Sequence, residues 1–273
     1  MIKIRTYGEV TAFCMGRSIG PLVPYRVYAF LMGNTLIDTG TAYARDEFMA
    51  ALRTKRVSTV INTHQHEDHI GNNTVVHDAF GAAVYAHEDC LPYMADPAAL
   101  KLKAYQRFVW GLPERCSGSP LGKSISCDGT TLQVIPSPGH SVGHVCLYEE
   151  KTGGLFTGDI FCGRAVRYLR RDEDFEEILS SLKNLARLDI STIFCSLKGI
   201  VNDGSAAIAA KIACMEDLKR QVRELADTGL SPREIRIRIL GYEDAMHYLT
   251  AAHFSKQHVI DSILAGRAET PCL

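Results

Sequence analysis

The sequence predicts an α/β domain built of packed layers, followed by a helical C-terminal extension. Strand-like and helix-like segments alternate through about the first three quarters of the chain, which is typical of layered α/β domains. Apolar residues make up 46% of the 273 residues, enough to bury a sizeable core. From residue 205 the pattern becomes helical. We therefore expect an α/β domain over residues 1–203 and a helical appendage over residues 204–273.

The N-terminal part of the chain is expected to begin with strands. These cover residues 2–5, 25–32 and 35–38, and Gly33-Asn34 between the last two is a turn typical of hairpins. Further along we expect a helix over 44–55, a strand over 57–62, a helix over 73–80 that Gly81 ends, and a strand over 83–86.

Residues 89–128 interrupt this alternation and are expected to form an insertion. They contain several prolines, one helical stretch expected over 98–110 and the aromatic residues Tyr93, Tyr105, Phe108 and Trp110. Such an insertion could be a lid over a cleft or the contact of a homodimer. It could equally be a helix that packs its aromatic side chains on the body.

The alternation resumes after the insertion. Strands are expected over 131–135, 144–148, 155–157 and 192–195, and one helical face carries the apolar residues Phe175, Ile178, Leu179, Leu182, Leu185 and Leu188. In the appendage, Gly229 is expected to end one helix. Residues 231–234, Ser-Pro-Arg-Glu, begin another with a capping box.

The charge balance limits the expected partners, and the cysteine content indicates the expected compartment. The 30 basic and 31 acidic residues nearly balance, which disfavours nucleic acid and anionic membranes as partners. No apolar stretch is long enough to span a bilayer, and no signal-peptide apolar region follows the N-terminus. The nine cysteines, from Cys14 to Cys272, include no CxxC pair, which favours a reducing compartment. We expect a cytoplasmic protein that acts on a small-molecule substrate.

Residues 64–69, His-Gln-His-Glu-Asp-His, form the densest cluster of metal-ligand side chains. Neutral imidazole and carboxylate are ligands for zinc and for iron. On an extended backbone, His64 and His66 point to the same side and converge on one ion. His140, in a loop rich in proline and glycine, is the next candidate ligand. Three histidines with an open position for water are typical of a catalytic zinc site.

A second group of candidate ligands comes from the same loop and from a later strand end. Asp68 and His69 are expected to point toward a neighbouring position, and Asp159 could bridge two ions. Two metal ions held close together can polarise a carbonyl or phosphoryl oxygen and deliver a bound hydroxide at neutral pH.

As an ordered set, these motifs resemble the metallo-β-lactamase-fold superfamily. The matching stretches are HxHxDH at 64–69, PGHSxGH at 138–144 and TGD at 157–159, preceded by Asp-Thr-Gly at 38–40. The resemblance spans about residues 20–200 and implies a four-layer αββα sandwich with the metals at one edge. It also implies one or two zinc ions, with iron or manganese as alternatives, and a role for Asp38 in steadying the ligand loop.

One position departs from the pattern of that family. Lys198 stands where the family supplies a last metal-ligand histidine. A protonated lysine cannot ligate and repels a second cation, so the second site could be weak or empty. Alternatively, Lys198 could pair with Asp68 or Asp159 beside a single metal, or His253 from the appendage could replace the missing ligand. With one metal, Asp68 would act as the base and Lys198 would stabilise an oxyanion or bind a substrate carboxylate.

The resemblance implies a metal-dependent hydrolase that uses a metal-bound hydroxide on a small ester, thioester, lactone or related acyl substrate. Glyoxalase II and the lactonases are the similar branches. One alternative is a mononuclear iron oxygenase resembling persulfide dioxygenases, and another is a non-catalytic metal-binding protein. Four arginines after Asp159 could recognise an anionic substrate or form a solvated loop; they are Arg164, Arg167, Arg170 and Arg171.

Overall fold

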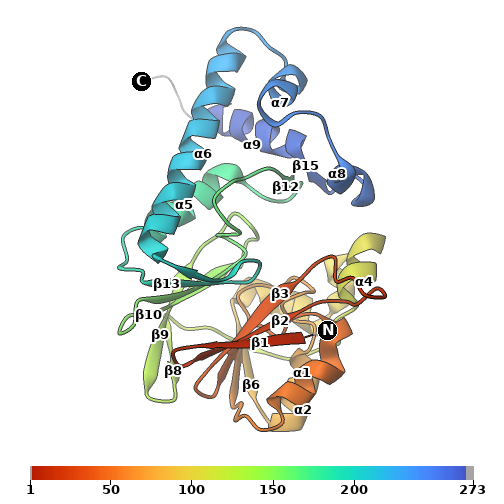
Figure 1. Ribbon diagram of the computed structural model, residues 1–273, viewed down its shortest axis with the longest axis vertical. Coiled ribbons are helices and arrows are strands. Elements are labelled where there is room, and N and C mark those ends of the chain that lie inside the picture. The colour runs from red at the N-terminus through yellow and green to blue at the C-terminus, as the bar shows by residue number, and fades with distance from the viewer. Residues whose placement is uncertain (1, 269–273) are drawn as a thin grey trace.

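The computed structural model, which describes residues 2–268, has the four layers expected of an αββα sandwich. Cys272 lies outside the described residues. Two large sheets face each other, and helices cover the outer face of each (Figure 1). Helices α1 and α2 lie at one end of the molecule, and α6, α7 and α9 lie at the other (Figure 1). None of the helices within the described residues has the length and apolar character needed to cross a bilayer.

The first sheet has seven strands in the order β1 to β7. They are β1 (Ile2–Tyr7), β2 (Val10–Met15), β3 (Val27–Met32), β4 (Thr35–Ile37), β5 (Thr59–Ile61), β6 (Ala83–Ala86) and β7 (Ser119–Pro120). Strands β1 to β4 pair antiparallel, and β4 to β7 pair parallel. Helices α1 (Arg45–Leu52) and α2 (Asn73–Phe80) make the crossovers between parallel strands. The bounds predicted for α2 and β6 agree with the structure.

Strand β2 was not predicted, because it is buried on both faces and so shows no alternation of polar and apolar residues. Phe13 and Met15 pack under the helices of the first outer layer. Val10 and Ala12 face the second sheet. The strand therefore contributes to two separate layers of the core.

The second sheet has six strands in the order β14-β13-β11-β10-β9-β8. They are β8 (Ser124–Cys127), β9 (Thr130–Pro136), β10 (Val145–Glu149), β11 (Gly154–Gly158), β13 (Thr192–Cys195) and β14 (Gly199–Asn202). Phe30 of the first sheet meets Phe156 and Phe194 of the second, with ring centroids 5.7 and 5.6 Å from that of Phe30. These rings fill the space between the sheets.

The segment from 89 to 128 differs in detail from the expectation. The single helix expected over 98–110 is wrong: a short 3-10 helix, Pro97–Leu100, precedes α4 (Ala104–Trp110). Lys101 separates them with a φ of 49°, in the left-handed region that ends helices. Helix α3 (Leu91–Ala95) precedes both, and β7 and β8 carry the chain from the first sheet to the second.

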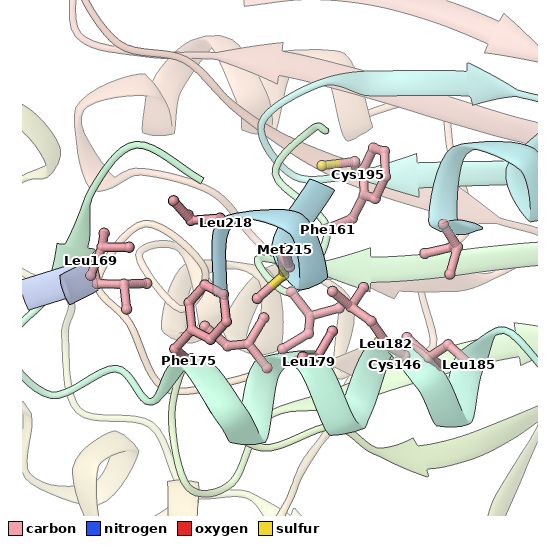
Figure 2. Close-up of a cluster of buried hydrophobic side chains, with 14 of the residues drawn as sticks. Cys146, Phe161, Leu169, Phe175, Leu179, Leu182, Leu185, Cys195, Met215 and Leu218 are labelled. Carbon is pink, nitrogen blue, oxygen red and sulfur yellow. The ribbon is translucent and has the colours of Figure 1, made fainter. Parts of the chain in front are cut away.

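The second outer layer joins α5 to the C-terminal helices. Its helices are α5 (Phe175–Leu185), α6 (Gly204–Asp227), α7 (Pro232–Leu240), α8 (Ala245–Leu249) and α9 (Lys256–Ala268). Figure 2 shows Phe175, Leu179 and Leu182 of α5 facing Met215 and Leu218 of α6 across a shared apolar core. The capping box predicted at the start of α7 is present.

The expectation of helix alone after residue 205 is wrong at one point. The two-residue strand β15 (Phe254–Ser255) pairs antiparallel with β12 (Leu169–Arg170). Two residues are too few to show the period of a strand, so pairing with a distant segment decides the structure here. Through this pairing, the C-terminal segment fixes the position of the stretch of chain between β11 and α5.

Candidate metal centre

Three imidazoles, those of His64, His66 and His140, converge in the structure. His64 and His66 lie in the loop between β5 and α2, and His140 lies in the loop between β9 and β10. One nitrogen from each ring lies within 4.8 Å of the others. The Nδ1 atom of His66 is 2.9 Å from Nε2 of His140, and all three side chains are buried. This arrangement could hold one metal ion.

A second group of ligand atoms adjoins the first and contains His64, His69 and Asp159. Asp159 directly follows β11, and its two oxygens face different histidines. Oδ1 lies 3.4 Å from Nε2 of His69, and Oδ2 lies 3.4 Å from Nε2 of His140. Asp68 Oδ2 is 3.9 Å from Nε2 of His69. The carboxylate of Asp159 therefore spans both groups, the geometry that a bridging ligand requires.

Hydrogen bonds on the outer nitrogens orient the rings. His69 donates from Nδ1 to Asp38 Oδ2 at 2.7 Å. His64 Nδ1 bonds to Thr63 Oγ1 at 3.0 Å, and that hydroxyl donates to Asp38 Oδ2 at 2.8 Å. His140 bonds through Nδ1 to Glu173. Each contact fixes the tautomer and turns the lone pair of the other nitrogen toward the centre.

The inner nitrogens fit a metal ion. Within residues 2–268, Nε2 of His64 and Nε2 of His69 are buried and have no hydrogen-bond partner. Leaving such an atom unsatisfied costs about 1–3 kcal/mol, and coordination would remove that cost. Imidazole nitrogens mixed with carboxylate oxygens suit zinc, iron and manganese.

The charge distribution also favours a cation. Burial and the neighbouring His69 hold the pKa of His64 well below its usual range, and burial together with Arg170 does the same for His66. Both rings are therefore neutral, the state that ligates. Burial opposes a proton on His69, yet Asp38, Asp159 and Asp68 raise its pKa well above the usual value. The carboxylates thus attract positive charge to this half of the centre.

Lys198 and His253, the two residues considered for the departing position, are not among the grouped ligand atoms within residues 2–268. Lys198 is exposed, and among residues 2–268 it forms no ion pair with Asp68 or Asp159. His253 Nδ1 is 2.6 Å from the hydroxyl of Tyr105, and His253 belongs to neither ligand group. The part that Lys198 plays stays a prediction.

Ser196 contacts the carboxylate of Asp159 from the turn after β13. It is buried, and its hydroxyl lies within hydrogen-bond distance of Asp159 Oδ1 and of the Gly158 carbonyl oxygen. Sequence reasoning missed Ser196 because a serine has no ligand signature of its own.

Strand β12 and the turn after it supply two further residues: Arg170, which sequence analysis considered only as one of four arginines, and Glu173, which it did not consider. Glu173 orients His140, as described above. Arg170 is buried, and its Nη1 lies 3.3 Å from Nδ1 of His66. The other three arginines considered as anion-recognition candidates are exposed. Only the run of arginines after Asp159 pointed to this segment, and nothing in it singled out Arg170.

A pocket of about 220 Å³ opens beside His66. Four segments line the pocket: the loop between β5 and α2, the 89–128 segment, residues 170–172 and the C-terminal segment. The lining residues include His66, Glu67, Tyr93, Lys103, Gln106, Arg170, Asp172 and His253. Glu67 Oε1 accepts a hydrogen bond of 3.0 Å from Gln106. Burial and the neighbouring Asp68 raise the pKa of Glu67 to about 7. The pocket is polar and partly open, and it lies next to the candidate metal centre.

Comparison with known proteins is consistent with this geometry. A sequence model of the metallo-beta-lactamase superfamily matches residues 23–196. The atrochrysone carboxyl ACP thioesterase of Aspergillus fumigatus is 28% identical over 196 residues, which cover 68% of this chain and 54% of that protein. A hydroxyacylglutathione hydrolase of Bdellovibrio bacteriovorus is 27% identical over 165 residues, covering 59% of this chain and 56% of that protein. The chain spans about half the length of these curated relatives.

Solved structures share the fold. The crystal structure of a metallo-beta-lactamase family protein from Thermus thermophilus aligns over 94% of both chains, with a TM-score of 0.68 and 20% identity. The similarity extends over the C-terminal helices as well as the two sheets, since so little of either chain is left out.

Proposed function

Because the chain belongs to the metallo-beta-lactamase superfamily, we propose that it is a metal-dependent hydrolase that cleaves a thioester of a small acyl group. The single observation that carries the proposal is Asp159, whose two oxygens face the two groups of histidines beside a polar pocket. The thioester is preferred among acyl substrates because two relatives are named as a thioesterase and as a hydroxyacylglutathione hydrolase. Esters and lactones are the neighbouring candidates.

In this proposal His64, His66 and His140 hold one ion, while Asp68, His69 and Asp159 hold a second. Zinc is the proposed metal, with iron or manganese as alternatives. A bound ion supplies hydroxide at neutral pH and polarises the carbonyl group of the substrate.

Individual residues have different roles in the proposed hydrolysis. If only one ion is bound, Asp68 is free of metal, and its buried carboxylate would accept a proton from the attacking water. The pair Glu67–Gln106 lines the pocket and offers hydrogen bonds to the acyl group or to the thiol part. Tyr93 and Lys103 of the 89–128 segment close one side of the pocket, which supports the lid among the roles considered for that segment.

A cytoplasmic location is part of the same proposal. All eight cysteines within the described residues are free, and most are buried. Unpaired thiols persist in a reducing compartment.

A substrate panel tests the proposed reaction. The full chain, purified without chelator, would be assayed with a 2-hydroxyacyl glutathione thioester, an acyl-pantetheine thioester, a lactone, an aryl ester and glutathione persulfide. We expect thiol release from a thioester to be fastest, and the His64→Ala variant to lose it. Oxygen consumption with the persulfide, without thioester cleavage, would instead support the iron oxygenase. Bound metal without turnover of any compound would support a non-catalytic role.

A further inference from the structure

Arg170 brings a buried cation to the edge of the metal centre. Its side chain is 9% exposed, and Nη1 lies 3.3 Å from Nδ1 of His66, a residue 104 positions away in the chain. Strand β12 carries it, and β12 is paired with β15, so that Arg170 lies opposite Phe254. The C-terminal segment thereby fixes the backbone of Arg170.

Two carboxylates hold the guanidinium and its backbone in place. Asp172 accepts a hydrogen bond from Nε of Arg170 at 3.0 Å and a second one from Nη2, so the contact is bidentate. Glu173 accepts from the backbone N–H of Arg170 at 2.6 Å while its other oxygen bonds to His140. Asp172 uses one edge of the guanidinium, so that Nη1 remains directed at the centre. The planar fork of arginine makes this direction well defined.

The contact between Nη1 and His66 points to a missing acceptor. Nδ1 of His66 has one lone pair, and in a metal-loaded centre that lone pair is given to the ion. The Nη1 hydrogen that faces it is then left without an acceptor in a buried site, which costs free energy. An oxygen atom of a substrate seated at the centre could supply the acceptor.

We propose that Arg170 is a catalytic residue that donates a hydrogen bond from Nη1 to the acyl carbonyl oxygen as this oxygen gains negative charge. The proposal rests on the proposed thioester hydrolysis. In that reaction the oxygen of water bonds to the acyl carbon and the carbon–sulfur bond breaks. The products are a thiol and a carboxylic acid, which loses its proton to solvent. Arg170 keeps its protons throughout and acts by charge and hydrogen bonding.

Kinetics of the metal-loaded full chain test this role. Removal of one such donor costs about 10²–10³-fold in kcat, so we expect Arg170→Gln to show that loss with little change in KM. Arg170→Lys keeps the charge but loses the fork geometry, and we expect it to recover part of the rate. Arg187→Gln, at an exposed position after α5, serves as the control and should match the wild type.

Ligand affinity and metal content distinguish a catalytic role of Arg170 from a role in supporting the metal centre. Methylphosphonate, a tetrahedral anion, is the probe for calorimetry, and we expect its affinity to fall by a factor similar to that in kcat in Arg170→Gln. Metal per chain, measured by elemental emission, should equal that of the wild type. Unchanged kcat and unchanged phosphonate affinity would overturn the proposal. Metal loss in parallel with kcat would also overturn it, because Arg170 would then only position His66.

The same binding experiment distinguishes the two proposals. If the wild type releases no thiol from any thioester, the proposed function fails, whereas the phosphonate affinities of wild type and Arg170→Gln still decide the role of Arg170. Equal affinities in that case would overturn the Arg170 proposal as well.

Discussion

The carboxylate of Asp38 lies 2.7 Å from Nδ1 of His69 and so determines which nitrogen of that ring faces the metal centre. The same carboxylate accepts the backbone N–H of Thr63 at 2.8 Å. Asp38 thus ties the end of β4 to the beginning of the ligand loop after β5. It occupies the supporting position that the resemblance of the sequence to the superfamily implied.

Removing the charge of Asp38 should weaken metal binding. Asp38 has a φ of 58°, and asparagine tolerates this conformation, so Asp38→Asn preserves the backbone. We expect metal affinity to fall about 10–100-fold, because the amide no longer stabilises the orientation of His69. Competition with a coloured chelator measures the affinity. The exposed Asp78→Asn is the matched control, and equal affinities in the two variants would show that Asp38 does not support the centre.

Ser196 and Lys198 should differ in their effect on the second metal. The hydroxyl of Ser196 contacts Asp159, whereas Lys198 is exposed. We expect Lys198→Ala and Lys198→His to keep the metal content of the wild type. In Ser196→Ala, the second ion should bind about 10–100-fold more weakly because a contact to the bridging carboxylate is lost. Elemental emission after dialysis gives the content, and a gain of metal in Lys198→His would show that the lysine does limit the second site.

The residues that converge at the candidate centre were predictable from the sequence because their signals are local. His64 and His66 share one loop, while His140 and Asp159 each follow a strand whose composition marks it. Parallel and antiparallel strands of the two sheets then bring these ends together. Strand β6 and helix α2 were likewise predictable, the latter from its apolar face and the glycine that ends it.

The sequence did not single out Arg170 among its four candidate arginines and did not indicate Glu173 or Ser196, because their contacts with the centre depend on distant segments. Arg170 and Glu173 reach the centre through β12, whose two residues are fixed by pairing with β15. A two-residue strand is too short to show a periodic pattern of polar and apolar residues in the sequence. The turn after β13 presents Ser196 rather than Lys198 to Asp159, and only the geometry of that turn decides between neighbours.

The C-terminal helices should unfold together with the sandwich. Met215 of α6 is fully buried in the core that it shares with α5. We expect Met215→Ala to lower the free energy of unfolding by about 2–5 kcal/mol, the range for such core truncations. The fluorescence of Trp110, the single tryptophan, and circular dichroism would follow urea denaturation. The exposed Asp217→Ala is the control, and an unshifted Trp110 transition in Met215→Ala would indicate that the helices unfold separately.

His253 should make the stability of the metal-free protein depend on pH. Burial and the charge of Arg170 lower the pKa of His253 from 6.5 to about 4, so the folded protein keeps it neutral. As the pH falls from about 6.5 toward 4, the unfolded chain takes up a proton that the folded chain does not, and the free energy of unfolding decreases.

We expect His253→Gln to reduce this decrease, measured as the difference in Tm between about pH 7 and about pH 4.5 after metal removal. The same substitution at the exposed His77 controls for the loss of one imidazole. An identical pH dependence in His253→Gln and the wild type would contradict the assignment.

Titration of the metal-free full chain with zinc tests the central claim, metal-dependent thioester hydrolysis, most directly. Thiol release from a 2-hydroxyacyl glutathione thioester would be followed at each addition of metal. The structure predicts no release before metal is added, a rise that saturates as the two ligand groups fill, and no rise in His64→Ala. Thiol release that does not depend on metal, or none at saturation, would contradict the assignment of this centre as a thioester hydrolase.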